Sequence, residues 1–118
     1  MRDFRKLKIW ELAHLLVLNI YEITKLFPKE ELYGLTSQLR RASVSIPTNI
    51  AEGCGKESNK DFARYLNIAL GSLSEVQYLL YLVRELNYVS EEKVSVLETN
   101  ANDLKKMIYS YQSKLSNT

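Results

Sequence analysis

The chain has 118 residues, 46% of them hydrophobic and 25% charged, a composition typical of one soluble globular domain that is large enough to bury a core. Its formal net charge of +2 permits nucleic-acid binding but does not argue for it, because typical nucleic-acid binders are much more basic. The single cysteine, Cys54, excludes an internal disulfide and is typical of a reducing compartment.

Apolar residues that recur every three or four positions predict amphipathic helices along the chain. The first predicted helix spans about residues 9–27 and is stopped by Pro28, whose ring cannot continue a helix. The second spans about residues 35–52. It is followed by Gly53 and Gly55, which suit a left-handed turn at the helix C-terminus.

The third and fourth predicted helices span about residues 59–86 and 91–115. Ser58 is a candidate N-cap of the third, because its hydroxyl can accept a hydrogen bond from the first helical turn. Apolar residues of both helices repeat at a spacing near 3.5, which predicts packing at crossing angles of roughly 20°. We therefore predict an all-α fold in which residues 1–118 form a single antiparallel up-down-up-down four-helix bundle.

The third predicted helix has more apolar surface than one core needs. Around residues 78–83 it is apolar on nearly every side, and such a helix should be buried on every side. Either it lies unusually centrally in the bundle, or it forms a subunit interface. We favour a homo-oligomer whose interface includes five residues of this helix, namely Tyr78, Leu79, Tyr81, Leu82 and Leu86.

Membrane association is not expected from this sequence. Residues 78–83 are too few to cross a bilayer, and polar residues such as Glu11, His14 and Glu22 interrupt the first predicted helix. The same interruptions argue against a signal peptide after the basic start of the chain. We therefore expect a cytoplasmic protein of bacterial type.

A polar stripe runs along the second predicted helix, beside its apolar face. It is more varied than an ordinary solvated face, which usually carries Lys and Glu. It is either a structural hydrogen-bonded network, completed by groups such as Ser72 and Glu75, or a surface that offers Arg41 and Asn49 to a ligand. Arg40 is expected on the opposite side of the helix. At about 100° per residue, the stripe contains Gln38, Arg41, Ser45, Asn49 and Glu52.

Pro47 lies in the middle of the same helix, where it removes a backbone donor and costs about 3 kcal/mol in a neutral context. One interpretation is a gentle kink that wraps the helix around the core, with the Ser43 hydroxyl near the freed carbonyl. The other interpretation is a kink that shapes a binding groove.

Basic residues supply the candidate phosphate contacts. Lys56, Lys60 and Arg64 recur at i, i+4 and i+8 and predict a basic line at the start of the third helix. Glu57 and Asp61 are expected to neutralise this line in part, and an ordinary solvated face is its alternative interpretation. The complete set of candidates is Arg2, Arg5, Lys6, Arg40, Arg41, Lys56, Lys60 and Arg64.

Catalytic chemistry has little support in this sequence. A single histidine and a single cysteine make neither a metal cluster nor a Cys–His pair. Cys54 follows a helix C-terminus, where the negative end of the helix dipole disfavours a thiolate. A metal-dependent nuclease would need acidic ligands, for which only Glu52 and Glu75 are suggestive. We expect neither enzymatic activity nor a cofactor or metal.

Several short segments carry a resemblance to a known family. They are Phe4, Leu7 and Trp10, and then residues 27–28, 33–35, 38–42, 45–47, 49–53 and 71–75. With these segments the sequence resembles the four-helix bundle family of 23S rRNA intervening-sequence proteins. The resemblance covers almost the whole chain and is most specific over residues 38–53, while the last helix matches only in type.

This resemblance implies an antiparallel four-helix bundle that assembles as a homopentamer. It also implies kinship with the accessory protein of diversity-generating retroelements, a pentameric bundle thought to bind nucleic acid and a reverse transcriptase. We therefore expect a non-enzymatic homo-oligomer that binds RNA or DNA through basic residues gathered by symmetry. The alternative is a scaffold that binds another protein through the apolar surface of the third helix or a groove at Pro47.

Overall fold

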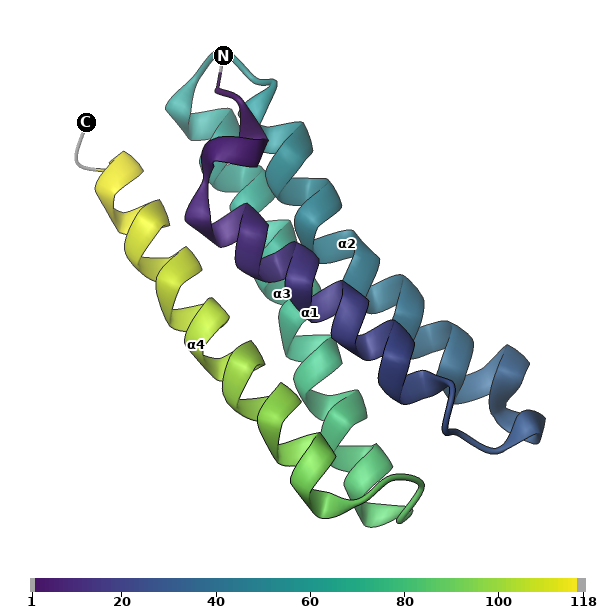
Figure 1. Ribbon diagram of the computed structural model, residues 1–118. Helices are drawn as coiled ribbons and strands as arrows, with labels where there is room; N and C mark the ends of the chain where they lie inside the picture. Colours follow the sequence, from purple (N-terminus) through teal and green to yellow (C-terminus); the bar gives the residue numbers. More distant parts are fainter. Residues whose placement is uncertain (1, 117–118) are drawn as a thin grey trace.

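The computed structural model describes residues 2–116 as four long helices joined by short connections (Figure 1). The helices are α1 (Lys8–Thr24), α2 (Ser37–Cys54), α3 (Asn59–Glu85) and α4 (Glu91–Ser116). None of the described residues lies in a strand. The predicted all-α fold is therefore confirmed.

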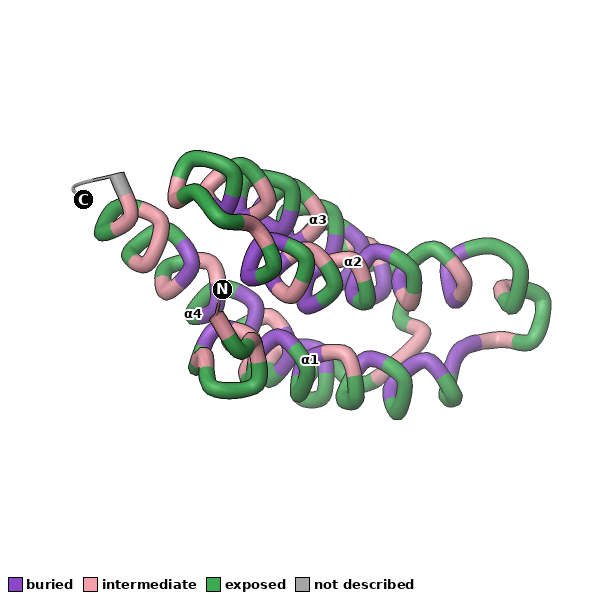
Figure 2. Tube along the Cα trace, turned by 90° about the horizontal axis from the view of Figure 1, so that it is seen from above, coloured by how far each residue is buried: buried purple, intermediate pink, exposed green. Residues whose placement is uncertain are grey.

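Consecutive helices run antiparallel and pack side by side, and α4 closes back against α1 (Figure 1). Seen from above, α2 and α3 form one layer, and α1 and α4 form the other (Figure 2). The N-terminal segment, the α2–α3 turn and the last turns of α4 share one end of the bundle, which we call the termini end. The α1–α2 connection and the α3–α4 turn occupy the far end.

The core is built from the apolar residues that repeat at helical spacing. The side chains that α3 buries along its central stripe are Phe62, Leu66, Ala69, Leu73, Val76, Leu80 and Val83. Those that α4 buries against them are Val94, Leu97, Ala101, Leu104 and Ile108. Because α3 packs against both α2 and α4, it buries more than one of its faces.

Helix α1 ends three residues earlier than the sequence predicts. It stops at Thr24, and the chain then turns through Phe27, which is still buried. Phe27 is apolar because it packs in the core, although it lies outside the helix. For this reason the helical pattern of apolar residues extended the predicted helix too far. Two short helical turns, η2 (Lys29–Glu31) and η3 (Leu32–Thr36), then lead into α2, which starts at Ser37.

The predicted left-handed turn after α2 is wrong. None of the described glycines has a positive φ, and α2 continues through Gly53 to Cys54. Gly53 has a different role, because a Cβ at this position would lie 2.6 Å from Cδ1 of Phe62. The absence of a side chain therefore lets the end of α2 pack closely against α3. A left-handed residue does occur after α3, at Asn87 with a φ of 58°.

Pro47 is buried inside α2, so it does not line an exposed groove. The Ser43 hydroxyl donates to the Arg40 carbonyl at 2.9 Å. It therefore bonds to a carbonyl one turn earlier than the one that Pro47 leaves without its usual donor. Burial of Pro47 therefore favours the interpretation of a kink that wraps the helix around the core over that of a kink that shapes a binding groove.

Helix α3 is long and apolar enough, by length and composition, to cross a membrane. This is weak evidence for a span, because the core helix of a soluble protein passes the same test. Here 44% of the apolar window is buried inside the bundle. Packing against α2 and α4 accounts for much of the hydrophobicity that the sequence shows in this helix.

Candidate nucleic-acid interface

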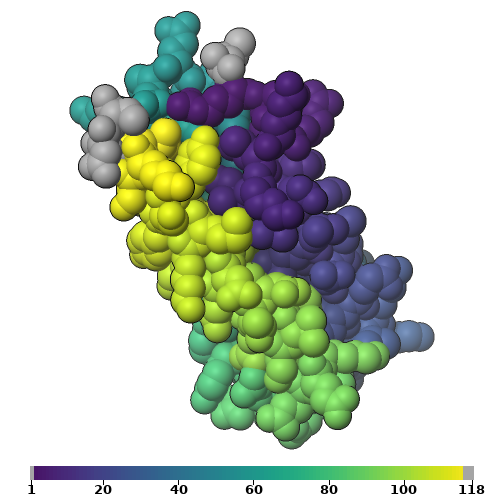
Figure 3. Space-filling view, turned by 60° about the vertical axis from the view of Figure 1, so that its left-hand side comes forward, coloured from purple at the N-terminus to yellow at the C-terminus, as the bar shows by residue number. Residues whose placement is uncertain are grey.

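Basic side chains gather at the termini end of the bundle. They come from the N-terminal segment, from the α2–α3 turn and from the first turns of α3, which Figure 1 places together and Figure 3 shows from another side. We call this group the basic end. Its members are Arg2, Arg5, Lys6, Lys56, Lys60 and Arg64.

Arg2 ties the N-terminal segment to the α2–α3 turn. Its backbone N–H donates to the Cys54 carbonyl at 3.2 Å, and its guanidinium donates to Asn59 Oδ1. The guanidinium carbon also lies 4.6 Å from the centroid of the buried Phe62 ring. These contacts hold a cation at the junction of three segments, and no carboxylate among the described residues pairs with it.

Lys56 and Arg64 meet over one aromatic ring, that of Tyr65. The Lys56 ammonium is 5.3 Å from the ring centroid, and the Arg64 guanidinium carbon is 4.9 Å from it. The predicted helical line of Lys56, Lys60 and Arg64 is wrong in its geometry, since α3 begins only at Asn59. Lys56 lies in the preceding turn, and the tyrosine ring rather than helical register brings it to Arg64.

Ser58 caps α3 as predicted, because its hydroxyl accepts the Asp61 backbone N–H at 3.1 Å. The cap fixes the turn that carries Lys56 against the start of the helix. The Asp61 carboxylate lies 3.9 Å from Arg64 Nε, and both side chains are more than half exposed. An exposed pair of this kind contributes little, so Arg64 is available for a stronger anion.

Arg5 is the most neutralised member of the basic end. Its Nε is 3.3 Å from Asp3 Oδ1, and its guanidinium lies 5.2 Å from the Phe4 ring centroid. The backbone N–H of Arg5, and then its guanidinium, lower the pKa of the Asp3 carboxyl below its ordinary value. Lys6 and Lys60 are exposed, and neither has an ion-pair partner among the described residues.

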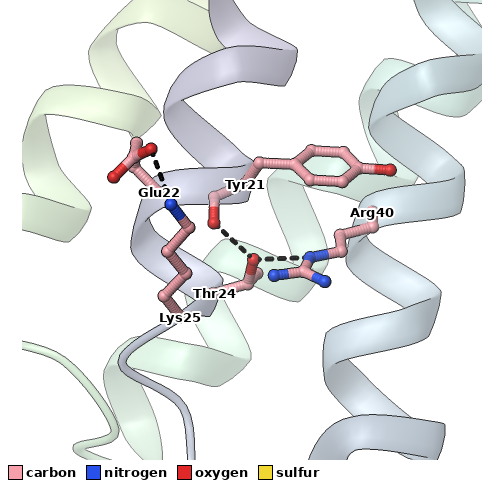
Figure 4. A network of polar contacts seen from close by, with 5 residues as sticks. All are labelled: Tyr21, Glu22, Thr24, Lys25 and Arg40. Carbon is pink, nitrogen blue, oxygen red and sulfur yellow. Dashed lines mark hydrogen bonds and ion pairs between the residues drawn. The ribbon is translucent and has the colours of Figure 1, made fainter.

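Arg40 does not belong to the basic end, because its side chain contacts α1. Its Nε donates to the Thr24 hydroxyl at 2.8 Å, and its guanidinium carbon lies 4.7 Å from the Tyr21 ring centroid. The Thr24 hydroxyl in turn donates to the Tyr21 carbonyl at 3.0 Å (Figure 4). Arg40 thus joins α2 to α1 on the side away from the polar stripe, as the helical wheel predicts.

Three members of the polar stripe hydrogen-bond inside the bundle. Gln38 donates to Glu75 at 3.3 Å, the hydroxyls of Ser45 and Ser72 are 2.8 Å apart, and Asn49 donates to the Ser45 carbonyl at 2.8 Å. The first two contacts join α2 to α3 and the third lies within α2, which matches the structural interpretation of the stripe.

The other two members of the stripe, Arg41 and Glu52, are exposed. Neither makes a side-chain hydrogen bond or ion pair to another described residue. Arg41 lines a shallow cleft with Gln38, Ser45 and Glu75, in the first half of α2 rather than at the basic end. The structure therefore does not bring Arg41 together with Lys56 and Arg64.

The apolar surface predicted on α3 is only partly exposed. Tyr78, Tyr81 and Leu86 are 60%, 52% and 43% exposed. Leu79 is only 2% exposed, because it packs in the core of the single chain, and its assignment to a subunit interface was wrong. Leu82 is half-buried against the core.

A second apolar surface was missed by the sequence analysis. A groove of about 500 Å³ lies between α1 and α4 near the far end, and a smaller one continues it along α1. The exposed apolar side chains that line these two grooves are Leu15, Leu26 and Val96. Their spacing fits the buried face of an ordinary amphipathic helix, so the sequence alone does not mark them as exposed. They remain uncovered because a groove separates α1 from α4 at this point.

Groups suited to metal or thiol chemistry are sparse. Among the described residues no cluster of three or more His, Cys, Asp or Glu could hold a metal ion. His14 is exposed and stacks on Trp10 with ring centroids 5.0 Å apart. Cys54 is buried, and burial raises the pKa of its thiol.

By its fold and its surface, the protein is a small antiparallel four-helix bundle with a basic end. The chain belongs to the 23S rRNA-intervening sequence protein family, whose sequence pattern matches residues 5–110. It is also similar in structure to a protein of unknown function from the S23 ribosomal protein family of Bacteroides thetaiotaomicron.

That similarity has a TM-score of 0.82 at 24% sequence identity, and it covers 88% of this chain and 97% of the other. At this identity the likeness supports the fold alone. Among curated proteins, no sequence matches the chain. The family resemblance seen in the sequence is confirmed.

Proposed function

We propose that this protein is a non-enzymatic homo-oligomer that binds RNA or DNA through its basic end. The observation that carries the proposal is the convergence of Arg2, Lys56 and Arg64 from three segments of the chain. Aromatic rings hold each of these cations in place. Ring contacts position a cation without cancelling its charge, so the charge remains available to phosphates.

Assembly would strengthen this weak field. The chain carries a net charge of only +2. In a symmetric oligomer the basic ends of several copies lie close together, and their positive potentials add. Assembly is also supported by three exposed side chains on α3, namely Tyr78, Tyr81 and Leu86. The free energy falls when a neighbouring copy removes apolar side chains of this size from water.

The test is fluorescence anisotropy with labelled structured RNA, single-stranded DNA and duplex DNA, each at two salt concentrations. We expect affinity that falls steeply with salt, because binding to phosphates releases counterions. Replacing Lys56, Lys60 and Arg64 together by Gln should reduce the slope of log Kd against log salt by about two to three.

A matched control removes three charges from the far end. Lys25, Lys29 and Lys93 are exposed there, and the triple change to Gln lowers the net charge by the same amount. This control should keep the wild-type slope. If both triple variants lose affinity equally, the binding reflects overall charge and the basic end is not the site.

The alternative function is a scaffold that binds another protein. The apolar groove between α1 and α4 and the exposed end of α3 favour it. A mainly apolar contact depends little on salt, whereas phosphate binding depends on it strongly. Absence of binding to all three nucleic acids at low salt, by a protein shown to be folded, would favour the scaffold.

A further inference from the structure

We propose that Tyr65 is a base-stacking platform and that the basic end therefore prefers single-stranded nucleic acid to duplex. This inference rests on the proposed nucleic-acid binding and adds the class of substrate. It is carried by the placement of two cations beside one partly exposed aromatic ring.

The backbone of α2 fixes the position of the tyrosine. A Cβ at Gly53 would lie 3.0 Å from the Cβ of Tyr65, so the stem of the tyrosine packs directly against the end of α2. The residue as a whole stays partly exposed. A side chain with two rotatable bonds and an anchored stem loses little conformational entropy when a ligand stacks on its ring.

The two cations place phosphate-binding groups beside the ring. The Lys56 ammonium and the Arg64 guanidinium lie within 5.3 Å and 4.9 Å of its centroid, and Lys60 is exposed on the same turns of α3. Aromatic rings in a positively charged groove bind single strands, because every base has a face that can stack. The planar Arg64 guanidinium can extend the stacking surface.

Duplex nucleic acid can use only part of this site. Its phosphates can reach the cations, but each base face is covered by the neighbouring base pairs. Exposing a face requires unstacking, and an anchored, partly buried ring is poorly suited to insert between base pairs. The ring should therefore add affinity for single strands and none for duplex.

Among the described residues, each of the other ring–cation pairs has a single cation, and the one on Phe4, Arg5, is paired with Asp3. The Phe62 ring beneath Arg2 is fully buried, so no base can reach it. Tyr21 is exposed and carries Arg40 (Figure 4), but it lies near the C-terminal end of α1, away from the basic end. Tyr21 is consequently a matched control, with the same ring and a cation of the same kind.

The experiment compares a labelled 20-nucleotide single strand with the duplex of the same sequence, using anisotropy. The proteins are the wild type, Tyr65→Phe, Tyr65→Leu and Tyr21→Leu. Tyr65→Leu should weaken single-strand binding by about 5- to 150-fold, the contribution of one stacked base, and leave duplex binding within about twofold. Tyr65→Phe keeps the ring and should bind like the wild type, as should Tyr21→Leu.

A second measurement uses single strands that carry 2-aminopurine, whose fluorescence falls when the base stacks on an aromatic ring. Wild type and Tyr65→Phe should quench it, and Tyr65→Leu should not. The wild-type result is informative even if Tyr65→Leu fails to fold. Absence of quenching in a bound wild-type complex would overturn the stacking role.

The two proposals fail in different ways. If neither strand form shows salt-dependent binding, the proposed nucleic-acid function is wrong. If both forms bind with similar affinity, or if Tyr65→Leu weakens them equally, nucleic-acid binding stands and the single-strand preference is overturned.

Discussion

Cations at the termini end are positioned mainly by aromatic rings. Arg2 lies over Phe62, and Lys56 and Arg64 lie over Tyr65. A cation over a ring gains about 0.5–1 kcal/mol at an exposed site, comparable to an exposed ion pair, yet it remains charged. At the residue scale, this is how a protein with a small net charge keeps a local surface that can bind anions.

The two helical glycines Gly53 and Gly71 should respond oppositely to alanine. A Cβ at Gly53 would lie 2.6 Å from the Phe62 ring, and one at Gly71 would meet nothing within 4 Å. We expect Gly53→Ala to lower the free energy of unfolding by about 1–3 kcal/mol, and Gly71→Ala to raise it by about 0.5–1 kcal/mol. Urea denaturation measures both. Equal effects would contradict the close approach of α2 and α3.

Glu31 and Tyr88 give stability a pH dependence. The Tyr88 hydroxyl donates to Glu31 Oε2 at 2.7 Å. This bond, followed by the Leu35 backbone N–H, lowers the pKa of Glu31 from its ordinary 4.5, and the same bond raises the pKa of Tyr88. A lowered carboxyl pKa contributes stability that is present above about 4.5 and lost as pH falls through the folded value.

Glu31→Gln should therefore lower the Tm at neutral pH and flatten its fall below about pH 4.5. The raised pKa of Tyr88 contributes stability below about 10 that is lost as pH rises through its folded value, so Tyr88→Phe should flatten the alkaline side. Circular dichroism melts across pH give both curves. The control is Glu30→Gln, which removes the same charge from the neighbouring residue. If this control changed the curve of Tm against pH in the same way, the role of the Tyr88–Glu31 hydrogen bond would be refuted.

At the element scale, polar contacts set how α2 meets its neighbours. Arg40 bonds to Thr24 on α1, while Ser45 and Gln38 bond to α3 on the other side. Small side chains at Ser45 and Gly53 let α2 approach α3 closely. The two sides of one helix thus specify two different partners, which favours a single packing arrangement.

The Ser45–Ser72 hydrogen bond should appear as coupling between α2 and α3. In a double-mutant cycle with Ser45→Ala and Ser72→Ala, we expect an interaction free energy of about 0.5–1.5 kcal/mol from urea denaturation. The exposed Ser110 on α4 supplies a comparison pair. Ser72→Ala and Ser110→Ala should add within about 0.5 kcal/mol. Additivity in both cycles would show that the serine contact contributes nothing.

At the scale of the whole molecule, charge is separated along the bundle axis. Basic residues predominate at the termini end, while at the far end acidic residues outnumber the basic residues Lys25, Lys29, Arg84 and Lys93. Figure 1 shows where the two ends lie. The acidic side chains of the far end are Glu22, Glu30, Glu31, Glu85, Glu91 and Glu92. An approaching polyanion would be oriented by this field toward the basic end, and the orientation would weaken as salt screens it.

Assembly can be tested with the exposed tyrosines of α3. We expect the wild type to sediment as an oligomer, and the Tyr78→Glu, Tyr81→Glu double variant to sediment as a smaller species, because carboxylates at an apolar interface would lose their hydration. Tyr109→Glu on α4 is the control, since Tyr109 is 53% exposed and Tyr81 is 52% exposed. A monomeric wild type, or an oligomer unaffected by the double variant, would contradict this interface.

The fold could be predicted in most of its parts. The 3.5-residue spacing through Leu73 and Val83 identified the buried face of α3, and the Ser58 cap marked where this helix starts. The start of the α1–α2 connection could not be predicted. Phe27 lies in the turn after α1, but its side chain is buried in the core, so the apolar pattern continues beyond the true end of the helix. Periodicity records burial and does not distinguish a helix from a turn that packs on the same core.

The sequence by itself determined the four helices, their buried faces and the opposite directions of Arg40 and the polar stripe, because helical periodicity is a local property. The tertiary structure alone decided which basic residues meet. It placed Arg40 against α1 and away from the basic end, placed Leu79 in the core, and brought Lys56 to Arg64 over Tyr65. These outcomes depend on which side chains face each other across separate segments, and that requires the packed positions of all four helices.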